Sequence, residues 1–267
     1  MKKTIALLLA VLLVCSFAAC GKKADKNTVT VGATPAPHCE ILEIAKDLMK
    51  EEGYTLVIKE FNDYIIPNEA VEEGELDANY FQHITYMNNF NVEHGTNLVS
   101  VAGIHYEPLG LYAGKTASLE ELQPGAKISV PNDATNEARA LLLLQQAGLI
   151  TLEEGVTIDA TKADIAENPL NLEIVEMEAA QLTSTLRDVD MAVINGNYAI
   201  DAELNVADAL AVEAADGAAA EAYVNVLTVK AGNENNEGIQ ALVKVLQSDE
   251  IRTYIEETYA GAVVPLF

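Results

Sequence analysis

Residues 127–148 read KISVPNDATNEARALLLLQQAG and contain two different sequence patterns. Residues 127–130 form a short strand-like stretch, and the EARALLLLQQAG segment that follows is rich in strong helix formers. Gly148 closes the segment, as glycine commonly does at the carboxyl end of a helix. This stretch therefore predicts a strand followed directly by a helix.

The same succession of strand and helix extends along the chain in both directions. Further strands are predicted at residues 28–32, 55–59, 76–78, 98–104, 172–177, 191–194 and 223–229. Further helices are predicted at residues 37–50, 67–73, 179–188, 237–247 and 249–259. Such alternation is typical of an α/β fold with largely parallel sheets. The length suits one large domain or two smaller ones.

The amino terminus has the pattern of an export signal. Lys2 and Lys3 precede an unbroken apolar run at 5–14, which is shorter than the roughly 20 residues that span a bilayer. Two alanines and Cys20 follow, so residues 1–19 are predicted to be a signal peptide that resembles those of bacterial lipoproteins. Lipid would then be attached to Cys20, and the polar residues 20–27 would be a tether. The alternative is an ordinary signal peptide with an incidental cysteine.

Charge and cysteine content limit the classes of function. The formal charge is −25, and without the two signal-peptide lysines it is near −27, which excludes nucleic acid as a partner. Cys15 lies in the signal peptide and Cys20 is the predicted lipid site. Cys39 is then alone, so no disulfide within the chain is expected. We interpret Cys39 as a small buried residue at a helix start rather than a catalytic thiol.

No motif of the sequence predicts an enzyme. The GLYAGKT stretch at 110–116 has three residues between its glycines, whereas a phosphate-binding loop has four. The histidines are scattered and lack metal-ligand spacing: His38, His83, His94 and His105. No pair of carboxylates stands out as acid and base. The sequence therefore predicts no catalysis, no cofactor and no metal.

Eight segments of the exported chain are more specific than these patterns. They read VGATPAPHCEILE, FNDYIIPNEA, LDANYFQH, HYEPLGLYAGK, SVPNDATNEARALLLLQQAGLI, ENPLNLEIVEMEAAQL, AVINGNYA and YVNVLTV. In this order and spacing they closely resemble the NlpA-type methionine-binding lipoproteins, which are substrate-binding proteins of ABC importers. PNDATNEAR and LDANYFQH are the most specific pieces.

The resemblance implies a two-lobed α/β fold of the periplasmic-binding-protein kind, type II, with the ligand in the cleft between the lobes. The first lobe would comprise residues 28–108 and 227–267, and the second residues 109–226. The chain would cross near EPLGLYA and return along YVNVLTV. Closure around the ligand would then be a hinge motion.

The resemblance also assigns an aromatic slot to the segment DANYFQHITY at 77–86. A methionine thioether gains from contact with ring edges, by roughly 0.3–1.5 kcal/mol each. The slot would be lined by Tyr64, Phe81, His83 and Tyr86, and Tyr80 is assigned to the core. Because this segment follows the strand predicted at 76–78, we expect its rings to project from a loop.

Two further groups of residues are implied for the zwitterionic end of the ligand. Arg139 would grip the carboxylate with two parallel hydrogen bonds near the amino end of its helix. The alternative for Arg139 is a surface residue paired with Glu137. Asn195 and Asn225 match family positions for the ammonium group. The roles of His105 and Glu107, which lie in HYEP, stay open.

Taken together, we expect a monomeric, lipid-anchored receptor on the extracytoplasmic face of the cell membrane. It would capture L-methionine or a close analogue and deliver it to an ABC permease and, through it, to the ATPase. A methionine-containing dipeptide, a methionine derivative or another small amino acid is the alternative ligand. An exported enzyme on a two-lobed scaffold is the alternative class, since fold alone does not fix function.

The lipid anchor is testable directly. Cys20→Ser should release the protein from membranes or leave it as uncleaved precursor, because serine offers no thiol for lipid attachment. Membrane fractionation with metabolic lipid labelling measures this. An unchanged, lipid-labelled membrane fraction would contradict the assignment.

Overall fold

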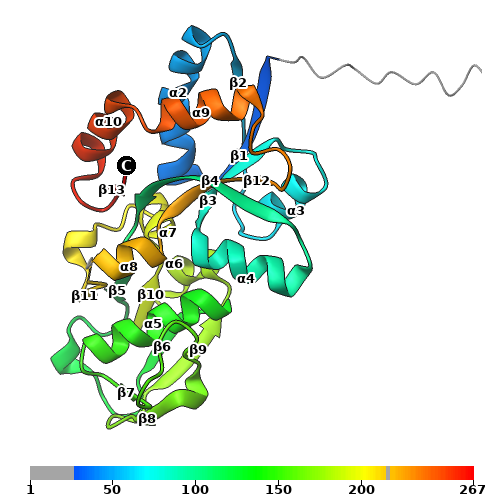
Figure 1. The fold of residues 1–267 in the computed structure, drawn as a ribbon. Helices are drawn as coiled ribbons and strands as arrows, with labels where there is room; N and C mark the ends of the chain where they lie inside the picture. The colour runs from blue at the N-terminus through cyan, green and yellow to red at the C-terminus, as the bar shows by residue number, and fades with distance from the viewer. Residues whose placement is uncertain (1–26, 215–216) are drawn as a thin grey trace, which may run out of the picture.

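The computed structural model describes residues 27–214 and 217–267. The predicted signal peptide at 1–19, Cys20 and most of the predicted tether lie outside these residues. Two sheets organise the chain, one of six strands in the order β13-β4-β12-β3-β1-β2 and one of five in the order β11-β5-β10-β6-β9. Each sheet forms the centre of one lobe (Figure 1). The predicted two-lobed α/β fold is confirmed.

The first sheet is mixed in strand direction. β1 is parallel to β2 and β3, whereas β12 runs antiparallel to both β3 and β4. Its strands are β1 (Thr28–Ala33), β2 (Thr55–Glu60), β3 (Ala78–His83), β4 (Leu98–Tyr106), β12 (Asn225–Lys230) and β13 (Val264–Pro265). The carboxyl-terminal part of the chain therefore belongs to the same lobe as its beginning.

Helices cover both faces of the first sheet, and each face has its own hydrophobic core. One core joins the sheet to α2 (Glu40–Glu51), α9 (Glu237–Leu246) and α10 (Asp249–Tyr259). The other joins it to α3 (Ile66–Glu72) and α4 (Ile84–His94). The short irregular turn η2 (Pro35–Cys39) leads into α2 and contains the cis peptide bond between Ala36 and Pro37. Cys39 is buried there with a free thiol, as expected.

The second sheet contains the strand and helix that were predicted at residues 127–148. β6 (Lys127–Pro131) is followed by α5 (Ala134–Gln146), whose core-facing leucines pack on the sheet. The remaining strands are β5 (Gly110–Ala113), β9 (Glu173–Met177), β10 (Met191–Ile194) and β11 (Ala211–Val212). The remaining helices are α6 (Leu182–Thr185), α7 (Gly196–Asp201) and α8 (Gly217–Ala222). A small hairpin comprises β7 (Thr151–Leu152) and β8 (Ile165–Glu167), and the 3₁₀ turns are η3 (Leu119–Glu121), η4 (Lys162–Asp164), η5 (Ala179–Gln181) and η6 (Val206–Asp208).

Two segments connect the sheets. The chain leaves the first sheet after β4 and enters the second at β5, and it returns between β11 and β12. The return was expected at residue 227, but Asn225 already pairs with His83 of β3 and His105 of β4. Asn225 and Val226 therefore belong to the first sheet.

One stretch differs clearly from the sequence prediction. The strand expected at 76–78 is β3, which reaches His83, and the unpredicted helix α4 begins one residue later. β3 is buried at all six positions because helices cover both faces, so its sequence lacks the alternation of a half-buried strand. Within the described residues, no helix is both long and apolar enough to cross a bilayer.

Candidate functional site

A pocket lies between the two lobes. Its wall is formed by the ends of β3 and β12, by α4, α5 and α7, by the turn between β10 and α7, by the loop before α3 and by the first connecting segment. The lining residues are Tyr64, Phe81, Gln82, His83, Tyr86, Glu107, Asn136, Arg139, Asn195, Gly196, Asn197 and Asn225. All seven residues expected to bind ligand are among them. We treat this pocket as the candidate ligand site.

The aromatic side of the pocket follows from the alternation of β3. Tyr80 points into the core beneath α2 and is fully buried, which confirms its assignment to the core. Phe81 points to the opposite face, and His83 follows two residues later. Both side chains therefore stand on a strand rather than on the expected loop. A strand fixes their direction more firmly than a loop does.

Three rings form the apolar wall. The ring centroids of Tyr64 lie 5.6 Å from those of Phe81 and of Tyr86. Phe81 and Tyr86 are 3% and 8% exposed. The Tyr64 hydroxyl donates across the cleft to Asn197 Oδ1 at 2.5 Å, so this wall spans both lobes. The sites at the edges of these rings suit a flexible apolar side chain.

Arg139 is buried and already holds a carboxylate of the protein itself. Its Nε and Nη2 donate to the two oxygens of Glu213 at 3.0 and 2.5 Å, and its guanidinium lies 4.1 Å above the Tyr223 ring. Nη2 also donates to the backbone oxygen of Glu107 at 3.1 Å. Nη1 has only a long contact, 3.4 Å to Asn136 Oδ1. The alternative of a surface arginine paired with Glu137 is wrong, because Arg139 is 3% exposed.

A cluster of amides joins Arg139 to the other lobe. Asn136 Oδ1 accepts from Asn195 Nδ2 at 2.9 Å and from His83 Nε2 at 3.2 Å. His83 Nδ1 accepts the backbone N–H of Tyr86 at 3.0 Å, so the proton of the neutral ring lies on Nε2. Burial, together with the charge of Arg139, lowers the pKa of His83 to about 3, so the ring is neutral at pH 7.

Asn195 has an unused acceptor. It is 5% exposed, and its Oδ1 has no hydrogen-bond partner. Among the buried side-chain nitrogen and oxygen atoms of the described residues, only Ser129 Oγ also lacks a partner. A buried carbonyl oxygen without a donor is costly. Since Asn195 lines the pocket, this oxygen is placed to accept a hydrogen bond from a bound molecule. Asn225 differs, because its Oδ1 already lies 3.1 Å from His38 Nε2.

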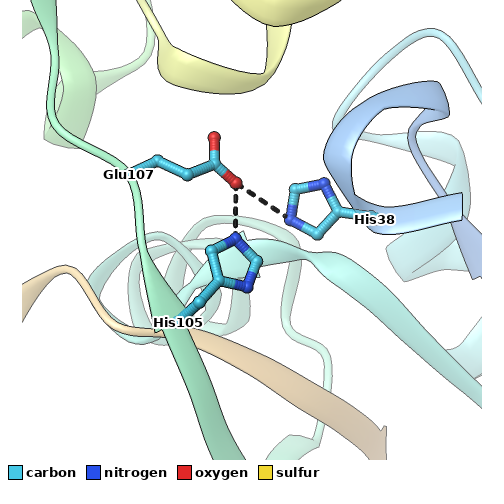
Figure 2. Close-up of side chains that lie close together, drawn as sticks. All are labelled: His38, His105 and Glu107. Atoms are coloured by element: carbon cyan, nitrogen blue, oxygen red, sulfur yellow. Dashed lines mark hydrogen bonds and ion pairs between the residues drawn. The ribbon is translucent and has the colours of Figure 1, made fainter. Parts of the chain in front are cut away.

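The fold brings together three residues that the sequence leaves apart. His38 of η2, His105 of β4 and Glu107 of the first connecting segment meet below the pocket (Figure 2). Glu107 Oε1 lies 2.6 Å from His105 Nε2 and 3.3 Å from His38 Nε2. The two histidines are far apart in the sequence but adjacent in the fold. Burial lowers the pKa of His38 to about 4 and that of His105 to about 3, and burial raises the pKa of Glu107.

This group is the one set of metal-type donors in residues 27–214 and 217–267 whose atoms lie within 4.8 Å of one another. Two imidazoles and a carboxylate are a donor set that divalent transition metals use. However, an Nε2–Oε1 distance of 2.6 Å is that of a charge-assisted hydrogen bond. We therefore interpret the group as a hydrogen-bond network.

Several lining residues were missed by the sequence analysis. Asn136 stands in the most specific family segment, PNDATNEAR, three residues before Arg139, and that position on the same helix face was the available signal. Gly196 has room for no side chain, because a Cβ there would lie 2.7 Å from Glu107 Cβ. Gln82 and Asn197 carried no signal that separates them from core or surface positions.

The model of the NlpA lipoprotein family matches residues 29–267. The chain belongs to the NlpA lipoprotein family. The resemblance drawn from the eight sequence segments is thereby confirmed.

Individual relatives of this NlpA lipoprotein agree in sequence and in fold. The methionine-binding lipoprotein MetQ of Bacillus subtilis is 41% identical over 93% of each chain. A putative lipoprotein of Ruminococcus gnavus has 57% identity and a TM-score of 0.89 over 90% of this chain and all of its own. A nutrient-binding protein of Burkholderia cenocepacia, solved with methionine bound, has 41% identity and a TM-score of 0.85 over 90% of this chain and all of its own.

The buried histidines of the site predict how stability depends on pH. His38, His83 and His105 titrate near 6.5 when unfolded and at about 4, 3 and 3 when folded. Between these values the unfolded chain binds more protons, so stability is full above pH 6.5 and falls as pH drops toward the folded values. Each titrating histidine contributes up to about 1.4 kcal/mol per pH unit. We expect chemical denaturation to show this fall between about pH 6.5 and 4.5.

A matched pair of variants separates the histidines from the many surface carboxylates. His83→Gln keeps an N–H donor but does not titrate, so the slope of stability against pH should decrease. His94 is exposed, and His94→Gln should leave the slope unchanged. Equal slopes in wild type and His83→Gln would contradict the prediction.

Proposed function

We propose that this chain is a lipid-anchored, extracytoplasmic receptor that captures L-methionine or a close analogue. It would deliver the ligand to an ABC permease and, through it, to the ATPase. The observation that carries the proposal is one pocket with an aromatic wall on one side and unused polar groups on the other. Names of relatives, including methionine-binding lipoproteins and a methionine-bound structure, support the same ligand.

The polar and apolar ends of methionine have matching surfaces in the pocket. The thioether tail would lie against Tyr64, Phe81 and Tyr86, where sulfur meets ring edges. The carboxylate would lie at Nη1 of Arg139, the one corner of the guanidinium without a short hydrogen bond. Arg139 was expected to hold the ligand carboxylate with two parallel hydrogen bonds. This expectation is modified, because Glu213 occupies the Nε–Nη2 edge of the guanidinium. His83 would contribute through Asn136, and Asn225 through its amide nitrogen.

Contacts across the cleft support a binding cycle by hinge closure. Tyr64 reaches Asn197, His83 reaches Asn136, and the Tyr198 hydroxyl donates to the backbone oxygen of Asn62 at 3.2 Å. Each of these bonds joins the two lobes and forms only when the cleft is closed. Ligand that contacts both walls would stabilise this closed state.

We infer a binding role rather than catalysis, with the protein acting as a monomer. The buried titratable groups beside the pocket are engaged with one another, and the nearest thiol, that of Cys39, has a pKa raised by burial to about 12. A dipeptide or other methionine derivative stays the alternative ligand. Ten of the twelve lining residues are buried, which favours a single small amino acid.

The aromatic wall is tested by a pair of matched substitutions. Phe81→Ala should weaken methionine binding by about 1–3 kcal/mol through lost burial and ring contact. Phe90 has the same 3% exposure in the same core cluster but does not line the pocket. Phe90→Ala should lower stability with little change in affinity. Titration calorimetry and thermal melting measure the two effects, and unchanged affinity in a folded Phe81→Ala protein would remove this ring from the site.

The carboxylate position is tested with methioninamide, which lacks the anionic charge. Wild type should prefer methionine strongly. Arg139→Lys keeps the charge but loses the planar fork, and Arg139→Ala should cost about 2–5 kcal/mol of binding free energy. The preference for acid over amide should shrink in both variants. Arg187→Ala, at an exposed position, is the control. The same preference in wild type and Arg139→Ala would place the carboxylate elsewhere.

A further inference from the structure

Two buried hydroxyls determine which nitrogen of each neighbouring histidine carries the proton. Tyr80 is fully buried, and its hydroxyl lies 2.5 Å from His105 Nδ1, its one partner in the described structure. Thr34, also fully buried, places Oγ1 2.8 Å from His38 Nδ1. A buried O–H that faced an N–H would leave its own proton without an acceptor. Each hydroxyl therefore donates to Nδ1, and each neutral ring carries its proton on Nε2.

The two hydroxyl–histidine pairs, Tyr80 with His105 and Thr34 with His38, differ in what their Nε2–H groups bond. His105 donates to Glu107 Oε1 at 2.6 Å, whereas His38 donates to Asn225 Oδ1 at 3.1 Å. Figure 2 shows both rings turned toward Oε1 of Glu107, at 2.6 and 3.3 Å. The backbone N–H of Asn197 also donates to this carboxyl group. The N–H groups of His105 and Asn197 favour the ionised form of this carboxyl group, whereas burial raises its pKa. Because both Nε2 atoms carry protons, neither offers a lone pair to a metal ion.

The Glu107 carboxylate has donors but no cation of its own. Arg139 is the nearest guanidinium, and it pairs with Glu213 and touches only the backbone oxygen of Glu107. Glu107 is 6% exposed and lines the pocket. The unpartnered Oδ1 of Asn195 lines the same pocket. The closed site thus contains a buried carboxyl group, whose pKa burial raises, and a free acceptor, and neither has a cationic hydrogen-bond partner in the described protein.

We propose that the Tyr80–His105 pair holds Glu107 as a counter-charge for the ligand's α-ammonium, and so makes the pocket selective for amino acids over acids that lack the amino group. This inference rests on the proposed function. An ammonium would donate to Glu107 and to Asn195, and it would remove both defects of the empty closed pocket. A ligand of the same shape without the amino group would leave the Glu107 carboxyl group and the Asn195 oxygen without this donor.

The histidines and hydroxyls act as positioning residues, because none of them lines the pocket. His105 contacts Glu107, and the two hydroxyls contact the histidines. Their effect should therefore appear in selectivity rather than only in affinity. The measured quantity is the ratio of Kd for 4-(methylthio)butanoate, which is methionine with hydrogen in place of the amino group, to Kd for L-methionine. Sites that hydrogen-bond a ligand group reject analogues without it by large factors, so we expect a wild-type ratio of about 100 or more.

Variants at His105 distinguish positioning from simple structural support. His105→Phe keeps a ring but removes the donor, and the ratio should fall about tenfold or more. His105→Gln places an amide N–H near the former Nε2 and should restore much of the ratio. Equal losses of affinity for both compounds in His105→Phe, with an unchanged ratio, would overturn the inference while leaving methionine binding intact.

A second variant protects the test against misfolding at His105. Tyr80→Phe removes one oxygen atom and frees the His105 tautomer, so the ratio should fall several-fold in a folded protein. Tyr112→Phe is the control, since that buried ring belongs to the core of the second lobe and does not line the pocket. An unchanged ratio in Tyr80→Phe would also overturn the inference.

Two further outcomes are decisive. Weaker methionine binding after treatment with a chelator would show that the histidines hold a metal and would overturn the inference. Failure of wild type to bind either compound would overturn the proposed function, and this inference with it. That result differs from an unchanged ratio with methionine still bound, so the two failures are distinguishable.

Discussion

The buried ion pair between Arg139 and Glu213 fixes the geometry on which the pocket depends. Arg139 belongs to α5 of the second lobe, and Glu213 to the segment that returns to the first. The same carboxylate accepts from the Tyr106 hydroxyl at 2.7 Å and from the Leu109 N–H at 3.3 Å, on the other connecting segment. Removing one partner of such a pair costs about 3–5 kcal/mol, because a buried charge is left alone. One interaction therefore ties both connections to the helix that faces the ligand site.

Local patterns predicted much of the fold because its strand–helix units are short and well marked. β6 and α5 follow directly from KISVPNDATNEARALLLLQQAG. β3 and α4 did not follow, since burial on both faces removes alternation from ANYFQH, and α4 begins with a cap from the His83 side chain rather than from Ser, Thr, Asp or Asn. The seven lining residues that were predicted from the sequence came from resemblance to a family, not from periodicity. Their convergence on one pocket required the fold.

The missing parts of the prediction are long-range contacts. Glu213 stands 74 residues from Arg139 in sequence, and His38 and Glu107 come from different elements of the first lobe. No spacing rule links such positions. The overall charge of −25 was also a poor guide to the pocket. Surface carboxylates are screened by salt over about 10 Å, whereas buried donors and one guanidinium set the local field.

The central claim is that the closed pocket holds one small amino acid with an apolar sulfur-containing tail. Receptors of this kind often keep their ligand through purification, so mass spectrometry of small molecules released by denaturing the purified protein is the most direct test. We expect one dominant species with the mass and fragmentation of methionine, in an amount close to that of the protein. A dipeptide, or an amino acid without sulfur, as the dominant species would contradict the claim.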